Sequence, residues 1–400
     1  MSPTWRVAHV ATIQPTVRFL LLPQLCRLRD EGYDVTAISA PGPYTRDVEA
    51  EGIRFIPWPH ATRAWKPAAD VRALRELLAI LRRERFDLLH THTPKPAILG
   101  RIGARAVGIP LVVNTVHGLY VKPDDSLKRR LPVLAVEWLA ARFSDAELYQ
   151  SEEDLAWARS LRLTRKGRST HLGNGTDLSR FDPEAISHGR LQVLRRQLGI
   201  PEGALVVGTV GRLVAEKGYR ELLAAFREVQ PAFPEIRFLA VGPKDPEKSD
   251  ALAEKEIAAA GDRVIFAGPR ADIPDLLALM DVFVLASWRE GLPRSAIEAA
   301  AMARPLILTE IRGCREVARD GIEGLLVPPR DPKRLAKALA RLLKDPQLRA
   351  RLGAAARARA ISRFDERAVF QVITETYERL LAGRRGRVRR LDERRRSTVR

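Results

Sequence analysis

Cysteine is nearly missing from this chain. Cys26 and Cys314 are the two present among 400 residues, and they lie far apart. Two isolated thiols form neither a disulfide framework nor a thiolate zinc site. We therefore expect a protein of a reducing compartment such as the cytoplasm.

Long apolar runs are also missing. The apolar cluster at residues 19–22 is interrupted by Pro23, and no stretch approaches the roughly 18 apolar residues that span a bilayer. The first residues show no basic segment followed by an apolar core and a small-residue cleavage site, as a secretory signal peptide would. These absences predict a protein that is soluble or peripheral to a membrane.

Acidic residues are outnumbered by basic ones, 49 to 68, which gives a net charge of +19. Part of this excess is local, because residues 384–400 contain nine arginines and two acidic residues. The segment 383–400 lacks apolar periodicity, so we expect a disordered basic tail that either solubilises the chain or contacts an anionic membrane. Nucleic acid is not an expected partner, since the chain shows no aromatic-interleaved basic stripe, helix-turn-helix or zinc-finger spacing.

The chain does show a regular alternation of short apolar runs with longer helical patterns. It begins with a strand at residues 6–10, a helix at 18–31 and a strand at 34–38, and it continues to a strand at 110–114. Such alternation is typical of βαβ units in an α/β fold with a parallel sheet. With 400 residues, 46% of them apolar, the chain is long enough for two such domains.

The segment 171–183 is rich in Gly, Asn, Asp and Pro, and a second alternating series follows it. We therefore predict an N-terminal Rossmann-like domain over residues 1–180 and a C-terminal one over residues 181–365. A helix at 366–382 is expected to pack back toward the N-terminal domain. Two facing domains of this class leave a cleft between them, where ligands bind beyond the carboxyl ends of the strands.

Two basic residues follow the first strand of the second series. Residues 206–218 read VVGTVGRLVAEKG, so a buried strand leads into a loop that presents Arg212 and Lys217 before a helix. Backbone amides and the helix dipole would add to these two cations, which suits a diphosphate. On spacing alone, the two residues are either such a clamp or ordinary solvated loop charges.

A second motif, EGLPRSAIE, runs from Glu290 to Glu298. Pro293 suits the first turn of a helix, which leaves the amides of Gly291 and Leu292 free to receive a phosphate or a sugar hydroxyl. The two glutamates are about 12 Å apart at helical rise, which exceeds the carboxylate spacing of a glycosidase pair. They are either exposed helix carboxylates or groups that hold two points of an extended ligand.

Together these motifs resemble family-four retaining glycosyltransferases of GT-B fold, in which two Rossmann-like domains face each other. The resemblance rests on residues 212–218, on the motif from Glu290 to Glu298, on GCREV at residues 313–317 and on DGIEGLLVPP at residues 320–329. It covers nearly the whole chain. The segment 88–118 resembles in particular members that act on lipid-linked oligosaccharide or exopolysaccharide intermediates.

The resemblance implies a role for each motif. Arg212 and Lys217 are expected to bind the diphosphate of a nucleotide sugar, and Glu298 its ribose hydroxyls. Glu290 is expected to hold the transferred sugar, together with the amides that follow it. Arg270 matches the place where such enzymes contact the nucleotide base.

His117 and Glu290 are the candidate catalytic residues. His117 closes a predicted strand, and a neutral imidazole there could bond a donor-sugar hydroxyl or assist the acceptor. Gly118 would let the backbone approach a ligand closely. A lone histidine after a strand is usually structural, but family members place a histidine before glycine at this point of the cleft.

His90 and His92 alternate on a predicted strand, a spacing that suggests zinc. No third ligand is evident in the sequence, and enzymes that resemble this one generally need no metal. We therefore expect no metal and no other cofactor, and we interpret the two histidines as lining the acceptor cleft.

The predicted helix at 126–143 combines a basic start with leucines and Trp138. It either packs on the core or lies in a bilayer interface. Together with the basic tail, it leads us to expect a cytoplasmic enzyme that is peripheral at the inner face of the cell membrane.

These observations predict an enzyme that transfers a hexosyl or N-acetylhexosaminyl group from a nucleoside-diphosphate sugar, such as a UDP-sugar, to a hydroxyl of a glycan or polyprenyl-linked acceptor, with retention. One alternative is an epimerase or hydrolase of the same fold. The alternative from another class is a protein that binds nucleic acid or another polyanion through its positive charge.

Overall fold

The computed structural model describes residues 4–246 and 248–398, with side chains described through Arg384. It divides into two compact units. Unit 1 contains Met1–Leu172 and Val369–Arg400, and unit 2 contains Gly173–Ala368. The sequence prediction placed the boundary after residue 180, whereas the structure places it after Leu172.

Unit 1 is built on a parallel sheet, whose described strands have the order β3-β2-β1-β4-β5-β6-β7. The strands are β1 (Arg6–Ile13), β2 (Asp34–Ala40), β3 (Arg54–Pro57), β4 (Leu88–His92), β5 (Leu111–Val116), β6 (Ala146–Tyr149) and β7 (Ser169–His171). The order reverses between β1 and β4, and sheets of this kind bind ligands at the carboxyl ends of such a pair.

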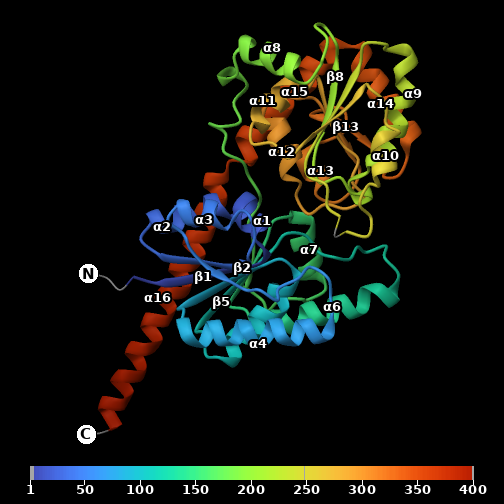
Figure 1. Ribbon diagram of the computed structural model, residues 1–400. Coiled ribbons are helices and arrows are strands. Elements are labelled where there is room, and N and C mark those ends of the chain that lie inside the picture. The colour runs from blue at the N-terminus through green and yellow to red at the C-terminus, as the bar shows by residue number, and fades with distance from the viewer. Residues whose placement is uncertain (1–3, 247, 399–400) are drawn as a thin grey trace. The chain divides into compact units, whose positions relative to one another are not determined.

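Helices cover both faces of this sheet. One face packs against α2 (Leu22–Asp30) and α16 (Glu366–Thr398), and the other against α4 (Pro67–Glu84) and α5 (Arg101–Ala106). Figure 1 shows α2 and α4 on opposite faces. The other helical segments are α1 (Gln14–Thr16), a π-helical turn (Val17–Leu21), α3 (Thr45–Ala50), a second π-helical turn (Pro96–Gly100), α6 (Leu127–Ala141) and α7 (Glu152–Ser160).

The last helix, α16, begins in unit 2 and contributes Ile373, Tyr377 and Leu381 to the core of unit 1. Its backbone stays helical to Thr398, so the disorder predicted for 383–400 differs from the structure up to that residue, and residues 399–400 lie outside the described part. Arginine is a good helix former, and lengthening an existing helix needs no new nucleus.

Unit 2 contains a second parallel sheet, with the order β10-β9-β8-β11-β12-β13 among its described strands. The strands are β8 (Val206–Val210), β9 (Arg237–Val241), β10 (Val264–Gly268), β11 (Val282–Leu285), β12 (Leu306–Thr309) and β13 (Gly324–Val327). Here the order reverses between β8 and β11. The two predicted Rossmann-like domains are therefore confirmed, while the cleft between them stays a prediction.

The helices of unit 2 also form two layers (Figure 1). One layer holds α9 (Tyr219–Val229) and α14 (Pro332–Lys344), and the other holds α8 (His188–Gln197), α11 (Ile273–Leu279), α12 (Arg294–Ala301) and α15 (Pro346–Arg363). Shorter segments are α10 (Glu254–Ala258), α13 (Cys314–Val317) and 3-10 turns at Pro183–Ala185, Ala215–Lys217 and Gln230–Ala232.

Candidate active site

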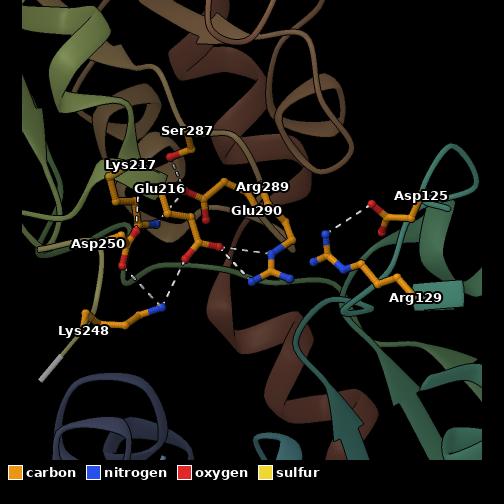
Figure 2. Close-up of polar contacts among 9 residues, drawn as sticks. All are labelled: Asp125, Arg129, Glu216, Lys217, Lys248, Asp250, Ser287, Arg289 and Glu290. Carbon is orange, nitrogen blue, oxygen red and sulfur yellow. Dashed lines mark hydrogen bonds and ion pairs between the residues drawn. The ribbon is translucent and has the colours of Figure 1, made fainter. Parts of the chain in front are cut away.

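The two sequence motifs of unit 2 meet where its sheet changes direction. β8 and β11 are neighbours, and each motif begins in the segment that follows one of them. Lys217 Nζ donates to Glu290 Oε1 at 2.6 Å, and Ser287 Oγ donates to the same oxygen at 2.6 Å (Figure 2). The structure thus brings together two predicted site residues that are far apart in sequence, and it adds Ser287.

Glycines allow these loops to pack backbone against backbone. Gly218 has φ +75°, and a Cβ at this position would lie 2.0 Å from the carbonyl oxygen of Ala286. Gly313 has φ +79°, and its Cβ would lie 1.7 Å from the carbonyl oxygen of Gly291. A side chain at either position would force the loops apart, so both glycines are required for the geometry around Glu290.

The other cations of this region are also paired with carboxylates. Arg212 donates to the buried Asp245 at 2.5 Å. Glu216 accepts from Arg289 at 2.8 Å and lies 3.4 Å from Lys248 (Figure 2). Such charge-assisted pairs hold long basic side chains in place beside the loops. Arg289 immediately precedes Glu290 and was not among the site residues that the sequence predicted.

The start of α12 offers backbone donors. The helix begins at Arg294 with Pro293 as its N-cap, and the amides of Gly291 and Leu292 donate no hydrogen bond to any residue that the structure describes. The carbonyl of Leu292 is held by Asn174 Nδ2 at 2.9 Å. Free amides at the positive end of a helix suit an anionic or hydroxyl ligand.

Glu298 lies within α12 and is paired with Arg294. Its Oε1 accepts from Arg294 Nε at 3.1 Å, and burial raises the pKa of its carboxyl. The side chain is 13% exposed. The ribose contact assigned to Glu298 stays a prediction.

Arg270 is not brought to the Lys217–Glu290 pair. It follows β10, which is separated from β8 by β9. Its guanidinium donates to both oxygens of Asp272, at 2.8 and 2.6 Å, and this hydrogen bonding lowers the pKa of Asp272. This geometry does not test the predicted contact of Arg270 with the nucleotide base, which stays a prediction.

In unit 1, His117 follows β5 at the carboxyl edge of the sheet, with Nε2 3.2 Å from Nδ1 of His92. Burial lowers the pKa of His117 to about 4, so the ring is neutral at neutral pH. His90 and His92 are fully buried, so our interpretation that they line an open cleft is wrong. Each faces inward because β4 is a central strand with helices on both faces.

The third histidine that the sequence analysis did not find is His9, on β1. Its Nδ1 lies 3.0 Å from His92 Nε2, and ligand nitrogens of His9, His90 and His92 all lie within 4.8 Å of one another. His9 and His90 are partners in the register of β1 and β4, which the sequence alone does not give. The expectation of no metal stays untested.

Unit 1 also has a basic groove at the amino ends of β5 and β6, on the sheet edge opposite His117. Its cavity volume is about 580 Å³. Six arginines line this arginine groove: Arg105, Arg142, Arg165, Arg168, Arg379 and Arg384. Asp145 is the acidic residue among the lining residues and pairs with Arg105. The exposed side chains of Arg165 and Arg379 bond to no described residue.

Helix α6 ends one residue before Arg142, which lines the groove, and it exposes apolar side chains. Leu127, Leu131 and Trp138 are 59%, 59% and 46% exposed. Arg142 stacks on Trp138, with 4.3 Å from its guanidinium carbon to the ring centre. Within the described part of the chain, no helix is both long enough and apolar enough to cross a membrane.

The chain matches two family descriptions. Residues 192–359 match "Glycosyl transferases group 1", and residues 21–175 match "Glycosyl transferase 4-like domain". The UDP-Gal:alpha-D-GlcNAc-diphosphoundecaprenol alpha-1,3-galactosyltransferase of Escherichia coli is 30% identical over 86% of this chain and 89% of its own length.

Two further comparisons agree. The N,N'-diacetylbacillosaminyl-diphospho-undecaprenol alpha-1,3-N-acetylgalactosaminyltransferase of Campylobacter jejuni is 24% identical over 94% of this chain and 99% of its own. The crystal structure of Anabaena HepE in complex with UDP and glucose superposes with a TM-score of 0.79, at 22% identity, over 94% and 99% of the two chains. With two such sheets, a paired Lys217–Glu290 site and this similarity, the chain belongs to the group 1 glycosyltransferases and has the GT-B fold.

Proposed function

We propose that this glycosyltransferase moves a hexosyl or N-acetylhexosaminyl group from a UDP-sugar to a hydroxyl of a polyprenyl-diphosphate-linked glycan, with retention. The observation that carries the proposal is the Lys217–Glu290 pair beside the free amides of Gly291 and Leu292. The names of the E. coli and C. jejuni relatives support the acceptor class, because both specify a diphospho-undecaprenol acceptor and an α-linkage. The E. coli name also specifies UDP-galactose.

The charge of the leaving group determines the roles in unit 2. When the sugar–phosphate bond breaks, the UDP diphosphate gains negative charge, which Arg212, Lys217 and the two amides can stabilise. Oε1 of Glu290 is engaged by Lys217 and Ser287. Its Oε2 bonds to no described residue, and we assign it to a hydroxyl of the transferred sugar.

The remaining roles that we propose are those that the family resemblance implies. Glu298 accepts from the ribose hydroxyls, and the region of Arg270 contacts the base. Neutral His117 bonds a hydroxyl of the donor sugar or of the acceptor. The departing β-phosphate oxygen takes the acceptor proton on the same face, which retains the anomeric configuration. We propose that no divalent metal is needed, since Arg212 and Lys217 supply the positive charge.

The test is a panel of UDP- and GDP-sugars against polyprenyl-diphosphate-linked saccharides, read by mass spectrometry and by NMR of the new anomeric proton. We expect one UDP-sugar to give an α-linked product at an unchanged rate in EDTA. Free or isomerised sugar without a new glycoside would indicate the hydrolase or epimerase alternative. A β-linked product would contradict retention, and activity lost in EDTA would contradict metal independence.

We further propose that the arginine groove and α6 hold the enzyme at the anionic inner face of the cell membrane. The groove has an excess of positive charge, and α6 exposes leucines and Trp138. Each basic residue near an anionic surface contributes about 1 kcal/mol. A variant truncated after Ala382 would lack Arg384, which lines the groove, and the basic residues that follow it in the sequence.

Flotation with neutral and anionic liposomes tests this contact. Arg165→Ala with Arg379→Ala should lower binding to anionic vesicles, and truncation after Ala382 should lower it further. Arg75→Ala with Arg82→Ala on α4 is the matched control, because it removes the same charge from exposed positions outside the groove. Equal flotation of both double variants, or binding that ignores salt and lipid charge, would contradict the proposal.

A further inference from the structure

An unbroken chain of hydrogen-bonded side chains runs through unit 1 and ends at His117. It joins β1, β4, β5 and α16 where the sheet changes direction. The links are Thr115 Oγ1 to His90 Nε2 at 2.7 Å, His90 Nδ1 to the Tyr377 hydroxyl at 2.6 Å, that hydroxyl to His9 Nε2 at 3.2 Å, His9 Nδ1 to His92 Nε2 at 3.0 Å, and His92 Nδ1 to His117 Nε2 at 3.2 Å.

None of these groups carries a charge at neutral pH. Burial lowers the pKa of His9 to about 3 and that of His117 to about 4, and it lowers those of His90 and His92 as well. Burial raises the pKa of the Tyr377 phenol, which keeps its proton. A neutral imidazole has one N–H and one lone pair. Each link must therefore pair a donor with an acceptor, so the direction of one link fixes its neighbours.

Tyr377 determines the direction, because its hydroxyl contacts two nitrogens and has one hydrogen. Hydroxyl donors make shorter hydrogen bonds than ring or amide N–H donors do. We therefore assign the 2.6 Å contact, the shortest in the chain, to Tyr377 donating to His90 Nδ1, which leaves His90 Nε2–H to donate to Thr115 Oγ1 at 2.7 Å. In the 3.2 Å contact, His9 Nε2–H donates to the Tyr377 oxygen.

The rest of the chain follows from that assignment. His9 Nδ1 carries a lone pair and accepts from His92 Nε2–H, so His92 Nδ1 carries a lone pair and accepts from His117 Nε2–H. We propose that Tyr377, through His9 and His92, holds His117 in its Nε2–H tautomer, with the lone pair on Nδ1. Tyr377 is then a positioning residue, supplied to unit 1 by the last helix of the chain.

The consequence for catalysis rests on the proposed function of His117. A lone pair on Nδ1 makes His117 an acceptor for a substrate hydroxyl and excludes the role of a neutral donor at that nitrogen.

The same histidines are close enough to suggest a metal ion. However, all six ring nitrogens of His9, His90 and His92 take part in the hydrogen-bond chain. A metal would have to replace several of these bonds in a fully buried site without a carboxylate. The hydrogen-bond chain is therefore the interpretation that the geometry favours, and a bound metal is an outcome that the experiment can detect.

The experiment is NMR of the full-length protein labelled with ¹⁵N-histidine, in which two-bond ¹H–¹⁵N couplings identify each tautomer. We expect His117 to show the Nε2–H pattern at neutral pH. In Tyr377→Phe the direction is no longer imposed, so the His117 signals should shift toward a mixture of both tautomers. The matched control is Tyr33→Phe, because Tyr33 packs edge-on against Tyr377 at 5.9 Å but lies outside the chain of hydrogen bonds. This control should leave the His117 signals unchanged.

The wild-type spectrum alone can overturn the proposal, even if Tyr377→Phe does not fold. A Nδ1–H or imidazolium pattern for His117 at neutral pH would do so, as would stoichiometric zinc in the purified protein. An unchanged His117 pattern in Tyr377→Phe would remove Tyr377 from the role. These readouts need no substrate, so they stay separate from the donor panel that tests the proposed function.

Discussion

The carboxyl edges of the two sheets carry opposite kinds of chemistry. In unit 2, the loops after β8 and β11 hold partly exposed charges in pairs, such as Lys217 with Glu290. In unit 1, β1 and β4 hold fully buried, uncharged imidazoles. We therefore expect ligand binding at the edge in unit 2 to depend on the charge of the ligand, and the stability of the edge in unit 1 to depend on pH. The same architecture supports both because its chemistry depends on individual side chains.

The largest expected effect is acid sensitivity of unit 1. The pKa of His117 falls from 6.5 in the unfolded chain to about 4 on folding. The unfolded state therefore binds more protons between these values, so the stabilisation is complete above pH 6.5 and is lost as the pH falls toward 4. At about 1.4 kcal/mol per pKa unit, His117 alone contributes roughly 3 kcal/mol. His9 acts in the same direction.

Hydrogen exchange at several pH values, corrected for intrinsic rates, measures this difference. Peptides from β1 and β4 should lose protection as the pH falls from 6.5 to 5, while peptides from β8 and β11 keep theirs. Unit 2 serves as the internal control, because His188 is its one histidine. Parallel loss of protection in both sheets would remove the histidines as the cause.

The second prediction concerns the charged edge. Lys217→Ala should weaken UDP binding and lower turnover at least tenfold, since a hydrogen bond to a charged group contributes about 1.5 to 3 kcal/mol. Calorimetric titration with UDP and initial rates measure both quantities. Lys244→Ala is the control, because it removes a lysine from an exposed pair with Glu254 in the same unit. Similar losses in the two variants would assign the effect to net charge.

The third prediction separates the two glutamates of the EGLPRSAIE motif. Glu298→Gln should weaken the binding of free UDP as much as the binding of the intact UDP-sugar, because ribose is present in both. Glu290→Gln should leave the affinity for free UDP unchanged and weaken the binding of the UDP-sugar, because the assigned partner of Glu290 is the sugar. Binding of UDP and of UDP-sugar to both variants decides the matter, and equal loss of UDP affinity would contradict these roles.

The smallest effect is expected for Arg270→Ala. Its guanidinium is already bonded to Asp272, and partly exposed pairs of this kind contribute about 0 to 1 kcal/mol. We expect UDP affinity to fall by no more than about fivefold, measured by the same titration. A loss as large as that of Lys217→Ala would show a direct base contact by the side chain.

The sequence could predict the parts of the fold in which apolar strand runs alternate regularly with longer helical segments. The alternation around β1, β2 and β8 was sufficient, whereas β6 and β7 are short and polar at Glu147 and Ser169 and were not identified. The motifs located Lys217 and Glu290 because both lie in loops directly after strands. His9 was missed because its partners are 81 and 83 residues away in the chain, and only the strand order brings them together.

The position of α16 also bears on how this chain matures during synthesis. Because Ile373, Tyr377 and Leu381 complete the core of unit 1, the first 172 residues leave the ribosome long before the helix that finishes their packing. Unit 2, made of consecutive residues 173–368, can fold before its predecessor is complete. A chain released from the ribosome but truncated near residue 370 would thus contain all of the second unit and lack the residues that complete the core of the first.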